Sequence, residues 1–184
     1  MTRRLFLTGP MGCGKSTAIE KALGERIIRC GGFRTRRQRD IEGHAVSFFL
    51  ESPDRKEQAI FLDVSSGKPE IRMEVFSQLG TRLLEGRVLV LDEIGGIELL
   101  CPEFMAQLER VLRNDTPILG VMKGPGPAGA LITALNLCEE YHVRSESLRQ
   151  WMLSDPETTL YECSQFDEKA LILAKNWVEE YLHA

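Results

Sequence analysis

The sequence predicts an α/β fold of three layers, in which a central, mostly parallel sheet lies between two layers of helices. Short apolar runs of strand length alternate with segments of helical periodicity along most of the chain. One of these runs, residues 88–91, is apolar throughout, which is typical of a strand buried on both faces in a parallel sheet. At 184 residues, with 43% hydrophobic and 27% charged residues, the chain has the size and composition of a single domain, 1–184.

The first strand and the first helix are predicted on either side of a glycine-rich turn. Residues 5–8 form the apolar run, residues 16–23 have helical periodicity, and Gly24 is suited to end the helix. From residue 27 to residue 64 the pattern changes to short β-like stretches, at 45–50 and 59–64, separated by turn residues. This part predicts a hairpin or small meander, an inserted β-hairpin within the α/β fold.

The alternation of helices and strands resumes after residue 73. Residues 73–84 have helical spacing and lead into the buried strand at 88–91. Beyond it we expect, in order, a helix at 104–112, a strand at 117–122, a Gly/Pro-rich loop at 124–129, helices at 130–141 and 145–153, a strand at 158–163 and a helix at 166–182.

The lack of a recognisable targeting signal and the spacing of the cysteines lead us to expect a protein of the cytoplasm. The opening apolar run stops at the glycine-rich turn, before a signal peptide would be complete, and no later run reaches the roughly 18 apolar residues of a membrane span. The five cysteines are scattered, and no two have the CxxC spacing of a zinc site. We therefore expect reduced thiols, a cytoplasmic location and no membrane partner.

The glycine-rich turn is a complete phosphate-binding motif. Its residues are Gly9, Pro10, Met11, Gly12, Cys13, Gly14, Lys15 and Ser16, which fit G-x-x-x-x-G-K-[ST] between a strand and a helix. Backbone N–H groups of such a turn point at a phosphate, helped by the positive end of the following helix. Lys15 would bridge the β- and γ-phosphates, the Ser16 hydroxyl would bind Mg²⁺, and Thr17 would donate to the α-phosphate. The alternative is a glycine turn with a solvated lysine.

Two carboxylates follow the buried strand. Asp92 and Glu93 come directly after residues 88–91, at the edge of the sheet where ligands of open α/β folds bind. Asp92 would accept from Ser16 or from a water on Mg²⁺, and Glu93 would polarise a water for attack on the γ-phosphate. Carboxylates after a strand also occur simply as the start of a solvated loop, and the phosphate-binding motif is what favours the catalytic interpretation.

Two further motifs carry a family resemblance. Residues 92–99 read Asp-Glu-Ile-Gly-Gly-Ile-Glu-Leu, with Phe104 beyond, and residues 32–35 read Gly-Phe-Arg-Thr, with Arg39 after them. In this order after the phosphate-binding motif, they resemble the signatures of the THEP family of small P-loop nucleoside triphosphatases. The resemblance covers about residues 4–121.

The resemblance implies a RecA-like core, Mg²⁺-dependent hydrolysis with broad nucleotide tolerance and a catalytic glutamate at Glu93. It also makes Glu98 and Arg39 candidates for a role near the site, against the alternatives of a helix-capping carboxylate and a surface charge. The chain departs from the family pattern at Ser47, where a glycine is expected. It departs again after Lys123, where the Gly/Pro-rich loop replaces a short histidine-containing turn. Lys123 would either reach the γ-phosphate or remain solvated.

Four arginines crowd the segment 34–39: Arg34, Arg36, Arg37 and Arg39. Such density is typical of phosphate or nucleic-acid recognition. The chain as a whole has a net charge of -4, and Phe33 is the only aromatic residue near these arginines that is placed to stack on a base. We therefore expect a role near a bound triphosphate, or a solvated hairpin, rather than nucleic-acid binding.

Three functions remain open from the sequence. The leading one is a nucleoside triphosphatase, with slow turnover because no arginine-finger motif is evident. A small-molecule or nucleotide kinase is the first alternative, with the arginine segment and the Gly/Pro-rich loop as lids. A nucleotide-dependent switch acting through an unknown protein partner is the second, although the Asn-Lys-x-Asp motif that reads guanine does not occur.

Overall fold

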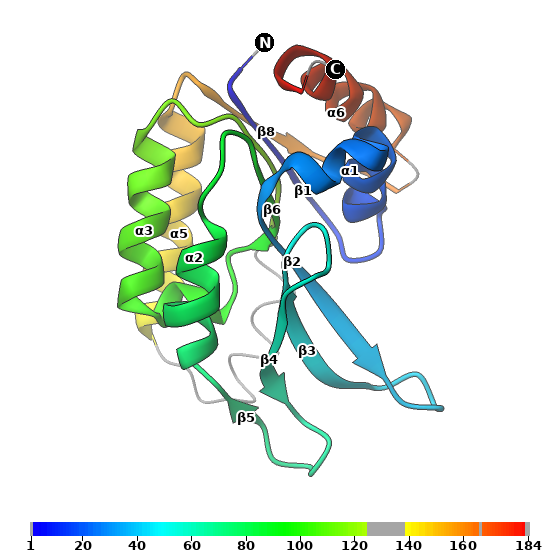
Figure 1. The fold of residues 1–184 in the computed structure, drawn as a ribbon, viewed down its shortest axis with the longest axis vertical. Coiled ribbons are helices and arrows are strands. Elements are labelled where there is room, and N and C mark those ends of the chain that lie inside the picture. Colours follow the sequence, from blue (N-terminus) through cyan, green and yellow to red (C-terminus); the bar gives the residue numbers. More distant parts are fainter. Residues whose placement is uncertain (1, 125–138, 166, 183–184) are drawn as a thin grey trace.

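The computed structural model describes residues 2–124, 139–165 and 167–182 (Figure 1). These residues form one eight-stranded sheet with the strand order β5-β4-β3-β2-β6-β7-β1-β8. The strands are β1 (Arg4–Thr8), β2 (Gly31–Arg39), β3 (Ala45–Glu51), β4 (Gln58–Asp63), β5 (Glu70–Ile71), β6 (Leu89–Ile94), β7 (Ile118–Met122) and β8 (Thr158–Glu162). The predicted α/β fold is confirmed.

The sheet has a parallel part and an antiparallel part. Strands β2, β6, β7, β1 and β8 pair in parallel, and β3, β4 and β5 continue the same sheet beyond β2 as an antiparallel meander. The predicted inserted hairpin is therefore not confirmed as a separate unit. The strand β7 lies between β1 and β6, so that the glycine-rich turn after β1 and the carboxylates of β6 are two strand positions apart.

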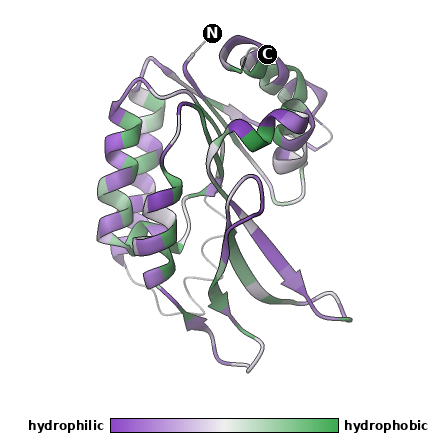
Figure 2. Cartoon of the chain, in the orientation of Figure 1, coloured by the Kyte–Doolittle hydropathy of each residue, from purple (hydrophilic) through white to green (hydrophobic). Residues whose placement is uncertain are grey.

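Helices cover both faces of the sheet. α2 (Thr81–Leu83), α3 (Pro102–Arg113) and α5 (Glu139–Ser154) lie on one side, and α1 (Lys15–Leu23) and α6 (Glu168–Tyr181) on the other (Figure 1). The helices carry hydrophobic and hydrophilic residues in alternating patches (Figure 2), as expected of helices that cover a sheet with one face. Shorter helical segments are two 3₁₀ helices, η1 (Gly24–Arg29) and η3 (Ile97–Leu100), and a π-helical turn, η2 (Phe76–Gly80), that leads into α2.

The strand β6 shows why the run 88–91 is apolar throughout. Leu89 and Leu91 belong to the hydrophobic core under α3 and α5, which also contains Phe104. Val88 and Val90 belong to the other core, under α1 and α6, which contains Trp177. Successive side chains of a strand point to opposite faces, so a strand between two helical layers requires apolar residues at every position.

Three expectations from the sequence need correction or fall outside the described residues. Residues 27–29 belong to the 3₁₀ helix η1, not to a β-like stretch, although Gly24 does end α1 and its N–H bonds to the Glu20 carbonyl. The helices predicted at 130–141 and 145–153 are not separate where the structure describes them, because α5 runs unbroken from Glu139 to Ser154. No glycine or proline occurs at 142–144 to end a helix there. The Gly/Pro-rich loop lies outside the described residues except for Gly124.

Among the helices that the structure describes, none combines the length and the apolar composition needed to cross a membrane.

Candidate active site

The glycine-rich turn and the carboxylates meet at one edge of the sheet. β1, β6 and β2 run in the same direction, so their carboxyl ends lie together. The turn connects β1 to α1, with positive φ angles at Gly12 (79°) and Gly14 (99°). A Cβ atom placed on either glycine would meet no other atom within 4 Å, so the backbone borders open space at both positions. Its geometry is that of a cradle for an anion at the N-terminus of α1.

Lys15 lies inside this cradle, with 8% of its surface exposed. Its Nζ donates to the carbonyl oxygens of Gly9 (2.9 Å) and Pro10 (2.8 Å) and to Sγ of Cys13 at 3.6 Å. Within the part of the chain that the structure describes, Lys15 forms no ion pair with a carboxylate. Its charge is therefore held by backbone dipoles and is available to a phosphate.

Ser16 and Asp92 are joined directly. The Ser16 hydroxyl donates to Oδ1 of Asp92 at 2.8 Å. Asp92 is 3% exposed, and this burial raises the pKa of its carboxyl to about 6, against the lowering effects of the Ser16 hydrogen bond and of Arg34, whose Nε lies 3.9 Å from Oδ2. A hydroxyl and a carboxylate are oxygen donors of the type that Mg²⁺ prefers, and a divalent cation would stabilise the ionised form that burial disfavours. The pair fits a magnesium site.

Glu93 extends from the end of β6 between two cations. Its Oε2 lies 3.6 Å from Nζ of Lys123 and 4.0 Å from NH2 of Arg37. The side chain is 19% exposed, so it remains accessible to water. The two cations thus hold the Glu93 carboxylate beside the phosphate cradle, where water can still reach it.

Glu98 and Arg39 occupy different surroundings. Glu98 is buried, and its Oε1 accepts hydrogen bonds from the backbone N–H groups of Gly95 and Gly96, both at 2.7 Å. Burial raises its pKa, and the nearby charge of Lys123 opposes this effect. Arg39 is exposed, and its NH1 donates to the Gly43 carbonyl in the β2–β3 turn at 2.5 Å.

A cavity of about 440 Å³ brings most of the predicted residues together. Its walls include the glycine-rich turn with Lys15, Ser16 and Thr17, and also Glu93 and Arg39. Lining residues that the sequence did not single out individually are Thr35, Arg36, Arg37 and Val121. The density of arginines in segment 34–39 is the sequence signal for these residues. The sequence does not show that β2 lies beside β6, and this pairing is what brings the arginines to the cavity. Glu98 and Lys123 are not among the residues that line this cavity, although Nζ of Lys123 lies 3.6 Å from Oε2 of Glu93.

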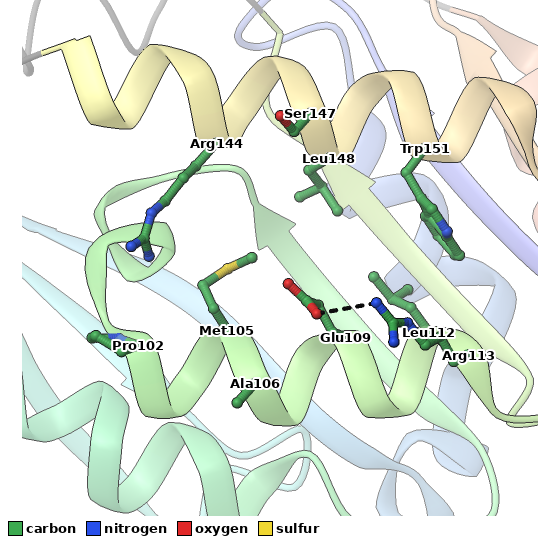
Figure 3. A pocket seen from close by; sticks show the side chains of 10 residues that line it. All are labelled: Pro102, Met105, Ala106, Glu109, Leu112, Arg113, Arg144, Ser147, Leu148 and Trp151. Atoms are coloured by element: carbon green, nitrogen blue, oxygen red, sulfur yellow. Dashed lines mark hydrogen bonds and ion pairs between the residues drawn. The ribbon is translucent and has the colours of Figure 1, made fainter.

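A second cavity, of about 470 Å³, lies between α3 and α5 (Figure 3). Met105, Leu112, Leu148 and Trp151 give it an apolar lining, and Glu109 and Arg113 form an ion pair on it. None of its lining residues belongs to the glycine-rich turn or to the acidic pair, so it is separate from the phosphate cradle.

Comparison with known proteins gives the same family as the motifs. Residues 4–148 match the family described as NTPase, a longer stretch than the motifs alone suggested. The nucleoside-triphosphatase THEP1 of Methanosarcina acetivorans is 30% identical over 132 residues, which are 65% of this chain and 75% of that protein. The cancer-related nucleoside-triphosphatase homolog of Mus musculus is 32% identical over 169 residues, 79% of this chain and 86% of that protein.

A solved structure has the same fold. The crystal structure of THEP1 from Aquifex aeolicus superimposes with a TM-score of 0.62 at 15% identity, over 97% of this chain and 98% of that one. The predicted resemblance is thus confirmed by the family match, by the relatives and by the fold. The chain belongs to the THEP-type family of P-loop nucleoside triphosphatases.

Proposed function

We propose that this protein hydrolyses nucleoside triphosphates to diphosphate and phosphate, in a Mg²⁺-dependent reaction, as one domain spanning residues 1–184. The observation that carries the proposal is the convergence of three groups on one cavity. Lys15 lies in the phosphate cradle, Ser16 is bonded to Asp92 beside it, and Glu93 lines the same cavity. Family membership supports the reaction class.

The glycine-rich turn would bind the phosphates. We propose that residues 9–17 hold the triphosphate through their backbone N–H groups, with Lys15 exchanging the carbonyls of Gly9 and Pro10 for phosphate oxygens. This exchange replaces two neutral acceptors by charged ones, which form stronger hydrogen bonds with an ammonium group. Thr17 would donate to the α-phosphate.

Ser16 and Asp92 would hold the metal. Mg²⁺ supplies, when bound, neutralisation of the charge on the β- and γ-phosphate oxygens. Asp92 is positioned for this role by its hydrogen bond to Ser16, and its burial keeps competing water away.

Glu93 would act on the attacking water. As the water oxygen forms its bond to the γ-phosphorus, the bond from that phosphorus to the bridging oxygen breaks and the diphosphate departs with the electron pair. The proton released by the water passes to the Glu93 carboxylate. Its accessibility and its place on the cavity wall support this assignment. Lys123, at 3.6 Å, would hold the carboxylate in position.

The surroundings of the site support broad base tolerance and the absence of a nucleic-acid partner. The described lining consists mainly of the phosphate-binding turn and arginines, which suit the phosphate groups that all nucleoside triphosphates share. Arg34 and Arg36 are bonded to Glu20 and Glu51 of this chain, so the arginine segment is largely engaged within the protein. The four cysteines among the described residues are buried and free, which is in keeping with a reducing, cytoplasmic environment.

The test is phosphate release from ATP, GTP, CTP and UTP without any acceptor, with Mg²⁺ and with EDTA. Release from all four that requires Mg²⁺ is the expected result. Tight binding of a nonhydrolysable analogue without release would contradict hydrolysis. Consumption of triphosphate that begins only with a small-molecule acceptor would indicate a kinase instead, and consumption that begins only with a partner protein would indicate a switch.

A further inference from the structure

Arg37 is placed by the sheet above the phosphate cradle. β2 pairs with β6 only through Gly31–Arg34, and Arg34 is level with Asp92. The rest of β2 pairs with β3 alone and continues past the edge of the parallel sheet. Since a strand advances about 3.3 Å per residue, Arg37 lies about 10 Å beyond the level of Asp92. The strand thus carries this arginine from the sheet to the side of the cradle where a γ-phosphate is expected.

The contacts of Arg37 connect the two halves of the proposed site. Its NH1 donates to Sδ of Met11 in the glycine-rich turn at 2.9 Å, and its NH2 lies 4.0 Å from Oε2 of Glu93. Phe48 is its cross-strand neighbour on β3, and the Phe48 ring centroid lies 5.8 Å from the guanidinium carbon. The guanidinium therefore lies over an aromatic ring and contacts both the glycine-rich turn and the proposed catalytic carboxylate.

The other arginines of segment 34–39 are bonded to other groups of the chain. Arg34 is bonded to Glu20 and faces Asp92. Arg36 donates to Glu51 and Gln58, both at 3.1 Å, and its guanidinium carbon lies 4.0 Å from the ring centroid of Phe49. Arg39 donates to the backbone of the β2–β3 turn. Among these four, Arg37 is the one that contacts both the glycine-rich turn and Glu93.

From this placement we propose that Arg37 is a built-in arginine finger, which leaves Glu93 when a triphosphate binds and donates to the γ-phosphoryl oxygens as they gain charge. This inference rests on the proposed hydrolysis and adds a catalytic residue to it. Negative charge grows on the bridging oxygen and the γ-phosphoryl group as the bond between them breaks, and a planar guanidinium donates to two such oxygens at once. The departure of Arg37 also frees the Glu93 carboxylate to accept the proton of the attacking water.

An arginine in this position is compatible with slow turnover. Switch GTPases with an arginine supplied by the same chain turn over at about 10⁻² per second, far below the rate reached with an activating partner. The sequence expectation of slow turnover rested on the absence of an arginine-finger motif. The finger is instead supplied by a strand residue that no motif marks.

The test compares Arg37→Ala and Arg37→Lys with the wild type and with two other arginine variants. Arg36→Ala removes the same charge from the neighbouring position of β2, and Arg72→Ala removes a half-buried arginine paired with Glu70 outside the cavity. For each protein we would measure kcat and KM for phosphate release, and the affinities for a nonhydrolysable triphosphate and for the diphosphate with Mg²⁺ and aluminium fluoride. Thermal melting would verify that each variant is folded.

For Arg37→Ala we expect kcat to fall at least about 100-fold, because arginine fingers contribute about 10³–10⁵ to kcat. Affinity for the aluminium fluoride complex should fall with kcat, while affinity for the nonhydrolysable triphosphate changes little. Arg37→Lys should recover only part of the rate, Arg36→Ala should lose much less, and Arg72→Ala should match the wild type. A kcat of Arg37→Ala close to that of the wild type would overturn the role of Arg37 and leave hydrolysis intact. So would an equal loss of affinity for both ligands with kcat unchanged. No phosphate release by the wild type would overturn the proposed function and the finger together.

Discussion

The Ser16 hydroxyl donates to Oδ1 of Asp92 at 2.8 Å, across 76 positions of sequence. This bond joins the glycine-rich turn after β1 to the acidic pair of β6, with β7 between the two strands. This hydrogen bond thus links the phosphate cradle to the proposed metal site.

Lys15→Ala should abolish tight binding of triphosphates. The ammonium of Lys15 is held by two backbone carbonyls, and charged hydrogen bonds contribute about 1.5–3 kcal/mol each, so we expect affinity to fall about 100-fold. Titration with a fluorescent nonhydrolysable triphosphate measures the effect. Lys21→Ala, which removes an exposed lysine from the same helix, is the matched control. Equal affinities of the two variants would refute the role of Lys15.

Asp92→Asn should raise stability while it lowers activity. Burial raises the pKa of Asp92 from 3.8 to about 6, so the folded state binds this proton more tightly than the unfolded state. The wild type therefore loses stability as pH rises from about 4 to about 6, by up to about 3 kcal/mol, and Asp92→Asn lacks this loss. Asparagine still accepts from Ser16 but has no charge for Mg²⁺.

The measurement for Asp92→Asn is urea unfolding of the nucleotide-free wild type and variant at pH 4 and pH 7.5, together with phosphate release at pH 7.5. We expect similar stability at the lower pH, a more stable variant at the higher pH, and a variant with little Mg²⁺-dependent activity. The same stability difference at both pH values would show that the Asp92 carboxylate carries no burial penalty.

Glu98→Ala should destabilise the turn that follows Glu93. The Glu98 carboxylate accepts from the N–H groups of Gly95 and Gly96, and an unsatisfied buried donor costs about 1–3 kcal/mol. The free energy of unfolding should fall by about that amount for each amide that finds no new partner. Since the turn adjoins Glu93, kcat should fall as well, with little change in triphosphate affinity.

Glu98→Gln keeps an acceptor oxygen and should retain most of the stability, while Glu109→Ala, at an exposed position of α3, controls for the loss of a carboxylate. Chemical denaturation measures the free energy of unfolding of all three variants, and initial-rate kinetics measure their kcat. If Glu98→Ala were as stable and as active as Glu109→Ala, the two hydrogen bonds would have no role in holding the turn.

The parts of the fold that follow from periodicity were predictable. The run 88–91 is apolar at every position because Leu89 and Val90 face different cores, and α6 presents Ala174, Trp177 and Val178 on its buried face. The phosphate cradle follows from its motif because a turn that binds phosphate through its backbone restricts the residues at almost every position. Local sequence determines both features, so sequence alone suffices to find them.

The features that depend on distant contacts were not predictable. The 3₁₀ helix η1 has no buried residue and no periodic pattern to mark it. The role of Arg37 depends on the pairing of β2 with β6, whose partners Arg34 and Asp92 are far apart in sequence. The four arginines of segment 34–39 are alike in sequence and differ in the partners that each one contacts, which depend on the sheet register.

The proposed hydrolysis is tested most directly by the rate of Mg²⁺-dependent phosphate release by Glu93→Gln at saturating triphosphate. Glutamine keeps the size of the side chain but accepts no proton from water, and general bases contribute about 10²–10⁴ to rate, so we expect kcat to fall at least about 100-fold. Affinity for a nonhydrolysable triphosphate should be retained, and Glu103→Gln, at an exposed position of α3, should behave as the wild type. Release by Glu93→Gln at the wild-type rate would contradict the assignment of Glu93 and with it the proposed mechanism of hydrolysis.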